Sequence, residues 1–126
     1  MHTLHHYFLC HSSRFIRICL EEKKIKFKLQ IENYWNPQNN FLLINPGGYF
    51  PVLITKDGYN IIGSTVIMEY LEDFDKNNFL LDLKSKSEIR RLVYWFEIIF
   101  KRDIIYPLLY EKIYKSIEKN LNPDNR

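Results

Sequence analysis

One cysteine, Cys10, lies in the stretch "FLCHSSRFIRICLEEK" (8–23), where a segment with strand character meets a segment with helix character. At the first turn of a helix, unpaired backbone N–H groups and the helix dipole favour an anion, so they lower the pKa of a thiol from about 8.5. Arg14 and a protonated His11 would add positive charge, and Ser13 could donate a hydrogen bond to the thiolate. The stretch therefore predicts a reactive thiol at Cys10, and the alternative is a small buried side chain.

The second cysteine and the histidines favour structural roles. Cys19 falls on the apolar face of the helix, where we expect it in the core and poorly placed for a disulfide with Cys10. His5 and His6 are adjacent on a strand and point to opposite faces, so they do not converge with Cys10 and His11. The spacing of these side chains matches no structural zinc pattern. The sequence therefore predicts no metal cofactor.

The composition of the 126-residue chain is that of a folded domain. Hydrophobic residues make up 46% and aromatic residues 16%, which is enough for a core and too apolar for a disordered chain. The net charge of +3 comes from mixed stretches such as "EEKK" and "KSKSEIRR", which favour a solvated surface over a nucleic-acid interface. No apolar run reaches the ~20 residues that span a bilayer, and the N-terminus lacks a signal pattern. We therefore expect a cytoplasmic protein with neither nucleic acid nor membrane as its partner.

The elements that must position Cys10 begin with a βαβ unit. "TLHHYF" (3–8) and "KFKLQIE" (26–32) alternate with the period of two that is typical of strands. The second segment places Phe27, Leu29 and Ile31 on one face, so we expect that face to be buried. The segment between the two strands has helical spacing and short joints, which predicts that the strands are parallel.

The next segment predicts a hairpin between two helices. "FLLINPGG" (41–48) is typical of a short helical turn, and the Asp-Gly pair of "KDG" (56–58) marks a hairpin turn between "FPVLIT" and "YNIIG". "STVIMEYLEDF" (64–74) then has the spacing of an amphipathic helix, with Ser64 or Thr65 as its cap.

The last third of the chain predicts helices alone. A polar joint, "DKNN" (75–78), precedes "SKSE" (85–88), which fits a capping box. Apolar residues keep helical spacing over 89–100 and again over 106–117, with Pro107 as a kink or a fresh start. Stripes this apolar need a partner, so we expect either the front portion of a larger two-domain protein or self-association.

Three stretches together resemble the N-terminal domain of a cytosolic glutathione transferase in residues, order and separation: "CHSSRFIRICLEEK" (10–23), "NPGGYFPVLIT" (45–55) and "IIGSTVIMEYLE" (61–72). The stretch 90–117 is similar to the first helices of the all-helical second domain, particularly in bacterial members. The resemblance implies an α/β thioredoxin-like domain (βαβ-α-ββα) over 1–75, a linker over 76–84, and a truncated, incomplete all-α domain over 85–126.

The resemblance also implies a glutathione site. Cys10 takes the place of the activating serine or cysteine at the strand-to-helix joint. Pro51 would be the cis-proline that faces it, and Phe50 would pair its backbone with the cysteinyl part of glutathione. Ser64 would hold the γ-glutamyl carboxylate through its hydroxyl and the N–H groups of the helix N-terminus.

Two positions of this implied site depart from the family pattern. Gly63, directly before Ser64, stands where an acidic or amide residue usually grips the α-amino group of glutathione. Tyr49 stands where a basic residue is often found. Both departures remove side-chain contacts to glutathione.

The function implied by the resemblance is an enzyme with glutathione as co-substrate. It would conjugate glutathione to a small electrophile, or exchange thiols with a disulfide through Cys10. Because a thiolate attacks disulfides well, exchange is favoured. The resemblance further implies a homodimer. Two alternatives stay open: a non-catalytic transferase-like binding module, which Gly63 and Tyr49 favour, and an inactive truncated fragment.

Overall fold

The strands form the central sheet of the molecule. Over the residues that this computed structural model describes (1–34, 36–74 and 82–119), the sheet has four strands in the order β2-β1-β3-β4. They are β1 (His2–His6), β2 (Phe27–Ile31), β3 (Val52–Ile54) and β4 (Asn60–Ile62). β1 is parallel to β2, with Leu4 opposite Leu29, and β3 is antiparallel to both β1 and β4. The predicted βαβ unit and hairpin are therefore confirmed.

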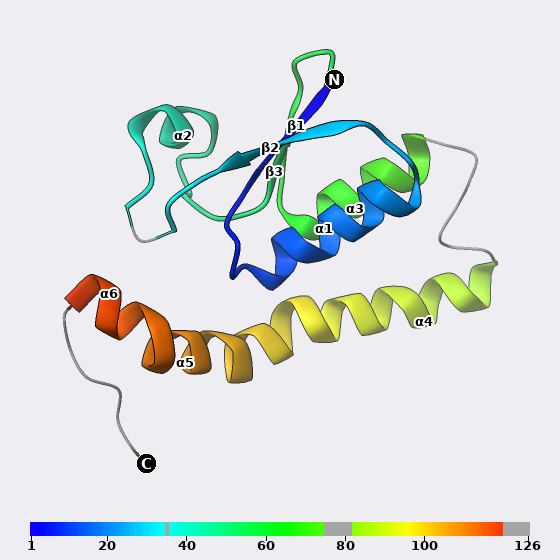
Figure 1. Cartoon of the computed structure of the whole chain (residues 1–126). Coiled ribbons are helices and arrows are strands. Elements are labelled where there is room, and N and C mark those ends of the chain that lie inside the picture. Colours follow the sequence, from blue (N-terminus) through cyan, green and yellow to red (C-terminus); the bar gives the residue numbers. More distant parts are fainter. Residues whose placement is uncertain (35, 75–81, 120–126) are drawn as a thin grey trace.

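Helices pack against both faces of this sheet. α1 (His11–Glu22) and α3 (Ser64–Phe74) lie side by side, and α2 (Asn39–Ile44) lies apart from them, on the other side of the strands (Figure 1). Successive side chains of a strand point to opposite faces of the sheet, and this alternation decides which helices each strand residue contacts. Leu4 and Leu53 pack with α1 and α3, whereas Val52 packs in a second cluster with Phe41 of α2. This is the thioredoxin-like fold that the sequence predicted.

The strand β2 is less buried than the sequence predicted. Leu29 and Ile31 are 46% and 54% exposed, and only Phe27 packs partly against the core. The expectation was wrong for the first two because β2 lies at the edge of the sheet, where its only strand neighbour is β1 among the described residues.

One long helical rod follows the sheet domain (Figure 1). Its consecutive segments are α4 (Leu83–Tyr94), the π-helical η1 (Trp95–Ile105), α5 (Tyr106–Leu109), the π-helical η2 (Tyr110–Tyr114) and α6 (Lys115–Lys119). The helix begins before the predicted capping box, because Asp82 caps it by accepting hydrogen bonds from the N–H groups of Lys84 and Ser85, both at 3.0 Å. None of the described helices is both long and apolar enough to cross a bilayer.

Pro107 does not begin a separate helix. It lies in the first turn of α5, directly after the π-helical segment η1. Proline has no N–H to donate and its ring crowds the carbonyl four residues earlier, so it disfavours an ordinary α-helical turn just before it. The wider turns before Pro107 carry the helix on in one piece.

The rod lies against the first domain at several points. Arg90 makes a two-pronged ion pair with Glu69 of α3, at 2.8 and 2.9 Å. Further along, Tyr114 packs in the cluster of Tyr7 and Phe50. Most of the predicted linker 76–84, namely 76–81, and the end of the predicted helical domain, 120–126, lie outside the described residues. The rod therefore passes close to the N-termini of α1 and α3, where the implied site lies.

Candidate functional site

Cys10 is the N-terminal cap of α1. Its N–H donates to the carbonyl of Tyr7 at 3.1 Å, which closes the turn between β1 and α1. Its Sγ accepts a hydrogen bond from the backbone N–H of Ser13 at 3.4 Å. Ser13 thus contacts the sulfur through its backbone, while its buried hydroxyl has no hydrogen-bond partner among the described residues. The half-buried thiol therefore lies at the N-terminus of the helix, with its sulfur held by a backbone N–H group.

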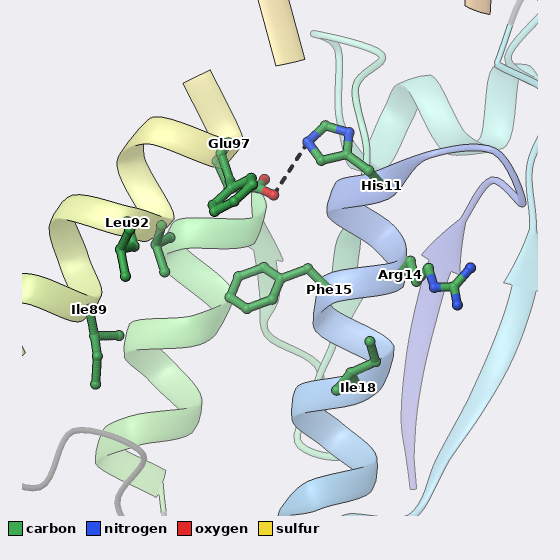
Figure 2. A pocket seen from close by; sticks show the side chains of 9 residues that line it. His11, Arg14, Phe15, Ile18, Ile89, Leu92 and Glu97 are labelled. Carbon is green, nitrogen blue, oxygen red and sulfur yellow. Dashed lines mark ion pairs between the residues drawn. The ribbon is translucent and has the colours of Figure 1, made fainter. Parts of the chain in front are cut away.

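His11 and Arg14, which the sequence predicted to add positive charge beside the Cys10 thiolate, have other surroundings in the structure. His11 Nε2 lies 3.4 Å from Glu97 Oε1 and 3.3 Å from Ser12 Oγ, so its ring is engaged by those side chains (Figure 2). Arg14 is exposed and is one of the residues that line an apolar groove between α1 and α4, and its side chain points away from Ile89 and Leu92 (Figure 2). Lys101 lines the same cavity as Cys10, and the sequence had not singled it out.

A cavity of about 300 Å³ opens in front of the Cys10 thiol. It lies between the start of α1, the 47–50 loop and the rod. Its lining includes Cys10, Tyr34, Tyr49, Phe50, Lys101 and Tyr106. Burial raises the pKa of both Tyr34 and Tyr106, so their phenols remain protonated hydrogen-bond donors at neutral pH. The cavity thus combines a thiol, a lysine and phenolic donors.

The residues proposed to contact the cysteinyl part of glutathione lie beside this cavity. The Phe50–Pro51 peptide bond is cis. Phe50 lines the cavity together with Cys10 and stacks on Phe41, with ring centroids 4.8 Å apart. Pro51 is fully buried, and its carbonyl accepts a hydrogen bond from Gly63 N–H at 3.0 Å. Gly63 is thereby held next to the same loop.

Ser64 makes a contact that the sequence did not predict. It is the first residue of α3, and its hydroxyl donates a short hydrogen bond to the Glu97 carboxylate of η1. Because α3 begins at Ser64, the cap position falls on Gly63, and Ser64 and Thr65 are both helical residues instead of the cap that the sequence predicted. The Ser64 hydroxyl therefore faces the rod, while the cavity in front of Cys10 is lined by other residues.

Glu97 is the functional candidate that sequence reasoning missed. It is 5% exposed and lies on η1 between apolar neighbours. Burial raises its pKa, but hydrogen bonds with His11, Ser12 and Ser64 outweigh burial, so the pKa lies below the ordinary value and the carboxylate is charged at neutral pH. The signal was one acidic residue inside the apolar run "WFEIIF" (95–100).

The remaining candidates lie apart from this site. His5 Nδ1 pairs with Glu32 Oε1 at 2.8 Å, and both side chains are buried. Among the described residues, no three His, Cys, Asp or Glu side chains are grouped so that they could hold a metal ion. Cys19 lies in the core as predicted, where burial raises its thiol pKa to about 11.

The fold and this site define a class of protein. Residues 9–73 match the family model described as the glutathione S-transferase N-terminal domain. The match covers more than half of the chain, and the chain belongs to the glutathione S-transferase family.

Particular relatives are similar over nearly the whole chain. FtsZ-localized protein A of Caulobacter vibrioides is 35% identical over 127 residues, covering 97% of this chain and 56% of that protein. The solved structure of FzlA from C. crescentus has a TM-score of 0.89 at 35% identity. A glutathione S-transferase of Rhodospirillum rubrum F11 has a TM-score of 0.92 at 36% identity, covering 100% of this chain and 58% of that one.

A more distant relative was solved with glutathione bound. This glutathione S-transferase of Methylobacillus flagellatus is 28% identical and has a TM-score of 0.66 over 75% of this chain. The chain itself spans little more than half the length of the curated relative and of the R. rubrum structure.

Proposed function

We propose that Cys10 carries out glutathione-dependent thiol chemistry. The observation that carries the proposal is the Cys10 thiol at the N-terminus of α1, which accepts the Ser13 N–H and opens onto the cavity of about 300 Å³. A thiolate there attacks disulfide sulfur readily, so exchange with a disulfide is favoured over conjugation to a small electrophile. Glutathione is the co-substrate, in keeping with the relative solved with glutathione bound.

The proposed exchange balances in two steps. In the first step, the Cys10 thiolate attacks the glutathione sulfur of a mixed disulfide between glutathione and a second thiol. A Cys10–glutathione disulfide forms and the original S–S bond breaks. The second thiol leaves as a thiolate, which takes up a proton. A second glutathione thiolate then attacks the glutathione sulfur of that adduct. Glutathione disulfide forms, and the electron pair of the broken bond returns to the Cys10 thiolate.

The proposed glutathione site uses the residues beside this thiol. Phe50 and Pro51 contact the cysteinyl part, and Gly63 and Ser64 receive the γ-glutamyl end. Phe50 supports this assignment because it lines the same cavity as Cys10. The proposal further places the protein in the reducing cytoplasm, where glutathione and free thiols coexist, and it includes the homodimer that is common in the family.

The test is covalent labelling of the thiol by glutathione disulfide. We expect the wild-type chain to gain one glutathionyl group in intact-protein mass spectrometry, and reduced glutathione to remove it. Cys10→Ser abolishes the gain, whereas Cys19→Ser, the matched control, leaves it unchanged because Cys19 is buried with a raised thiol pKa. A label on Cys19 instead, or none at all, contradicts the proposal.

A second candidate function rests on the relative named FtsZ-localized protein A. The similarity covers 97% of this chain at 35% identity, which favours a shared partner. In this alternative the chain is a transferase-like module that binds FtsZ and needs no turnover. Co-sedimentation with FtsZ filaments of the same organism tests it: Cys10→Ser should co-sediment as well as wild type. If neither the wild type nor Cys10→Ser is found in the FtsZ pellet above background, this candidate is excluded.

A further inference from the structure

The starting observation is a carboxylate of the chain itself at the position proposed for a ligand carboxylate. The Ser64 hydroxyl, which the proposed function assigns to the γ-glutamyl carboxylate of glutathione, donates to Glu97. His11 lies 3.4 Å from the other carboxylate oxygen (Figure 2). Glu97 is 5% exposed, so its carboxylate fills this position and leaves little room for a second one.

The surroundings of Glu97 are those of an anion site. α3 begins at Ser64, and the N-terminus of a helix attracts negative charge. Lys101 reaches the same group of side chains, with Nζ 3.3 Å from Ser12 Oγ. One carboxylate is therefore well accommodated here. A second would meet like charge in a buried region, where repulsion is weakly screened.

We propose that Glu97 is a built-in competitor for the carboxylate of glutathione and thereby a specificity-determining residue of the site. While Glu97 accepts the Ser64 hydrogen bond, the site rejects a γ-glutamyl carboxylate, and glutathione binds fully only when the Glu97 side chain swings away. Thiols that lack this carboxylate reach Cys10 without displacing Glu97. This inference rests on the proposed function, because it concerns the same ligand at the same thiol.

The test compares two thiols and two matched glutamate variants. Reduced glutathione is titrated by calorimetry into wild type, Glu97→Gln and Glu88→Gln. Glu88→Gln is the control, because Glu88 is an exposed glutamate of α4 whose ion pair among the described residues is with Arg91. We expect Glu97→Gln to bind at least tenfold more tightly and Glu88→Gln to match wild type. Cysteinylglycine, which lacks the γ-glutamyl group, should bind all three equally.

A second variant pair isolates the Ser64 hydroxyl. In the Glu97→Gln background, Ser64→Ala should remove most of the gain in glutathione affinity, whereas in wild type the same change should have little effect. Such non-additivity is expected of two residues that share one contact. If glutamine unfolds the chain, which a thermal melt reveals, Glu97→Ala removes the carboxylate and leaves its position beside Ser64 and His11 open to the ligand.

The outcomes separate this inference from the proposed function. If wild type binds glutathione as tightly as Glu97→Gln, or more tightly, Glu97 is no competitor and the inference is wrong while the proposed function stands. If no variant binds millimolar glutathione but Cys10 still reacts with glutathione disulfide, the inference alone is overturned. If Cys10 is also unreactive, the proposed function is wrong and the inference fails with it.

Discussion

Gly63 combines an unusual backbone conformation with a position next to Ser64. Its φ is +94°, and a Cβ added there would meet the nearest atom, of the Tyr49 ring, at 3.9 Å, an ordinary contact. The conformation, and not the space, therefore favours glycine. We expect Gly63→Ala to lower the free energy of unfolding by about 1–2 kcal/mol, measured by urea denaturation.

A matched variant separates the effect of backbone conformation at Gly63 from the effect of side-chain crowding. Gly63→Asn adds a larger side chain, but asparagine tolerates positive φ better than alanine. It should therefore cost less stability than Gly63→Ala. Equal or larger loss with asparagine would mean that crowding against Tyr49 decides the effect.

The residue-scale part of the site was predictable where one short segment determines it. The strand-to-helix change at Cys10 placed the thiol on the N-terminal cap of α1, because alternation ends and helical spacing begins there. Glu97 was not predictable in the same way. Its partner Ser64 is 33 positions away, and periodicity shows which face a residue occupies but not which distant side chain it meets.

At the scale of elements, Glu97 joins the rod to the first turns of α1 and α3. Its hydrogen bonds with His11, Ser12 and Ser64 lower its pKa against the opposing effect of burial. A carboxylate whose pKa is lower in the folded state than in the unfolded chain stabilises the fold above the unfolded pKa. That stability is lost as pH falls through the folded value.

This linkage gives a pH-dependent prediction for Glu97→Gln. At pH 7 the free energy of unfolding of Glu97→Gln should be about 1.5–3 kcal/mol lower than that of wild type, because hydrogen bonds to a charged carboxylate are replaced by hydrogen bonds to a neutral amide. The gap should narrow as the pH falls below the ordinary glutamate value of 4.5. Urea denaturation of both proteins from pH 7 to pH 3 measures it, with Glu88→Gln as the exposed control. A gap that is constant with pH would show that packing, and not the charge of Glu97, stabilises this contact.

The helical rod shows the limit of prediction for elements. Apolar spacing correctly predicted helix on both sides of Pro107, and the missing N–H of proline predicted either a kink or a fresh start at that residue. The chain continues through π-helical turns on both sides of α5, and apolar periodicity does not reveal their wider hydrogen-bond spacing.

At the scale of the whole molecule, an apolar groove of about 380 Å³ runs between α1 and the rod. Figure 2 shows Phe15 and Ile18 of α1 facing Ile89 and Leu92 of α4 across it. Leu92 and Phe96, which belong to the apolar stripe over 89–100, are 41% and 49% exposed, so the first domain covers that stripe only in part. Exposed apolar surface of this kind binds apolar probes.

The groove should therefore bind the dye anilinonaphthalene sulfonate, with a rise in fluorescence. Leu92→Gln removes an apolar wall from the groove and should weaken dye binding several-fold. Val66→Gln, the matched control on α3, changes a residue that is 56% exposed and does not line the groove, so it should leave binding unchanged. If wild type binds no dye, the groove is filled in solution. Light scattering then distinguishes a second copy of the chain, which doubles the mass, from a rearranged rod, which leaves the mass of one chain.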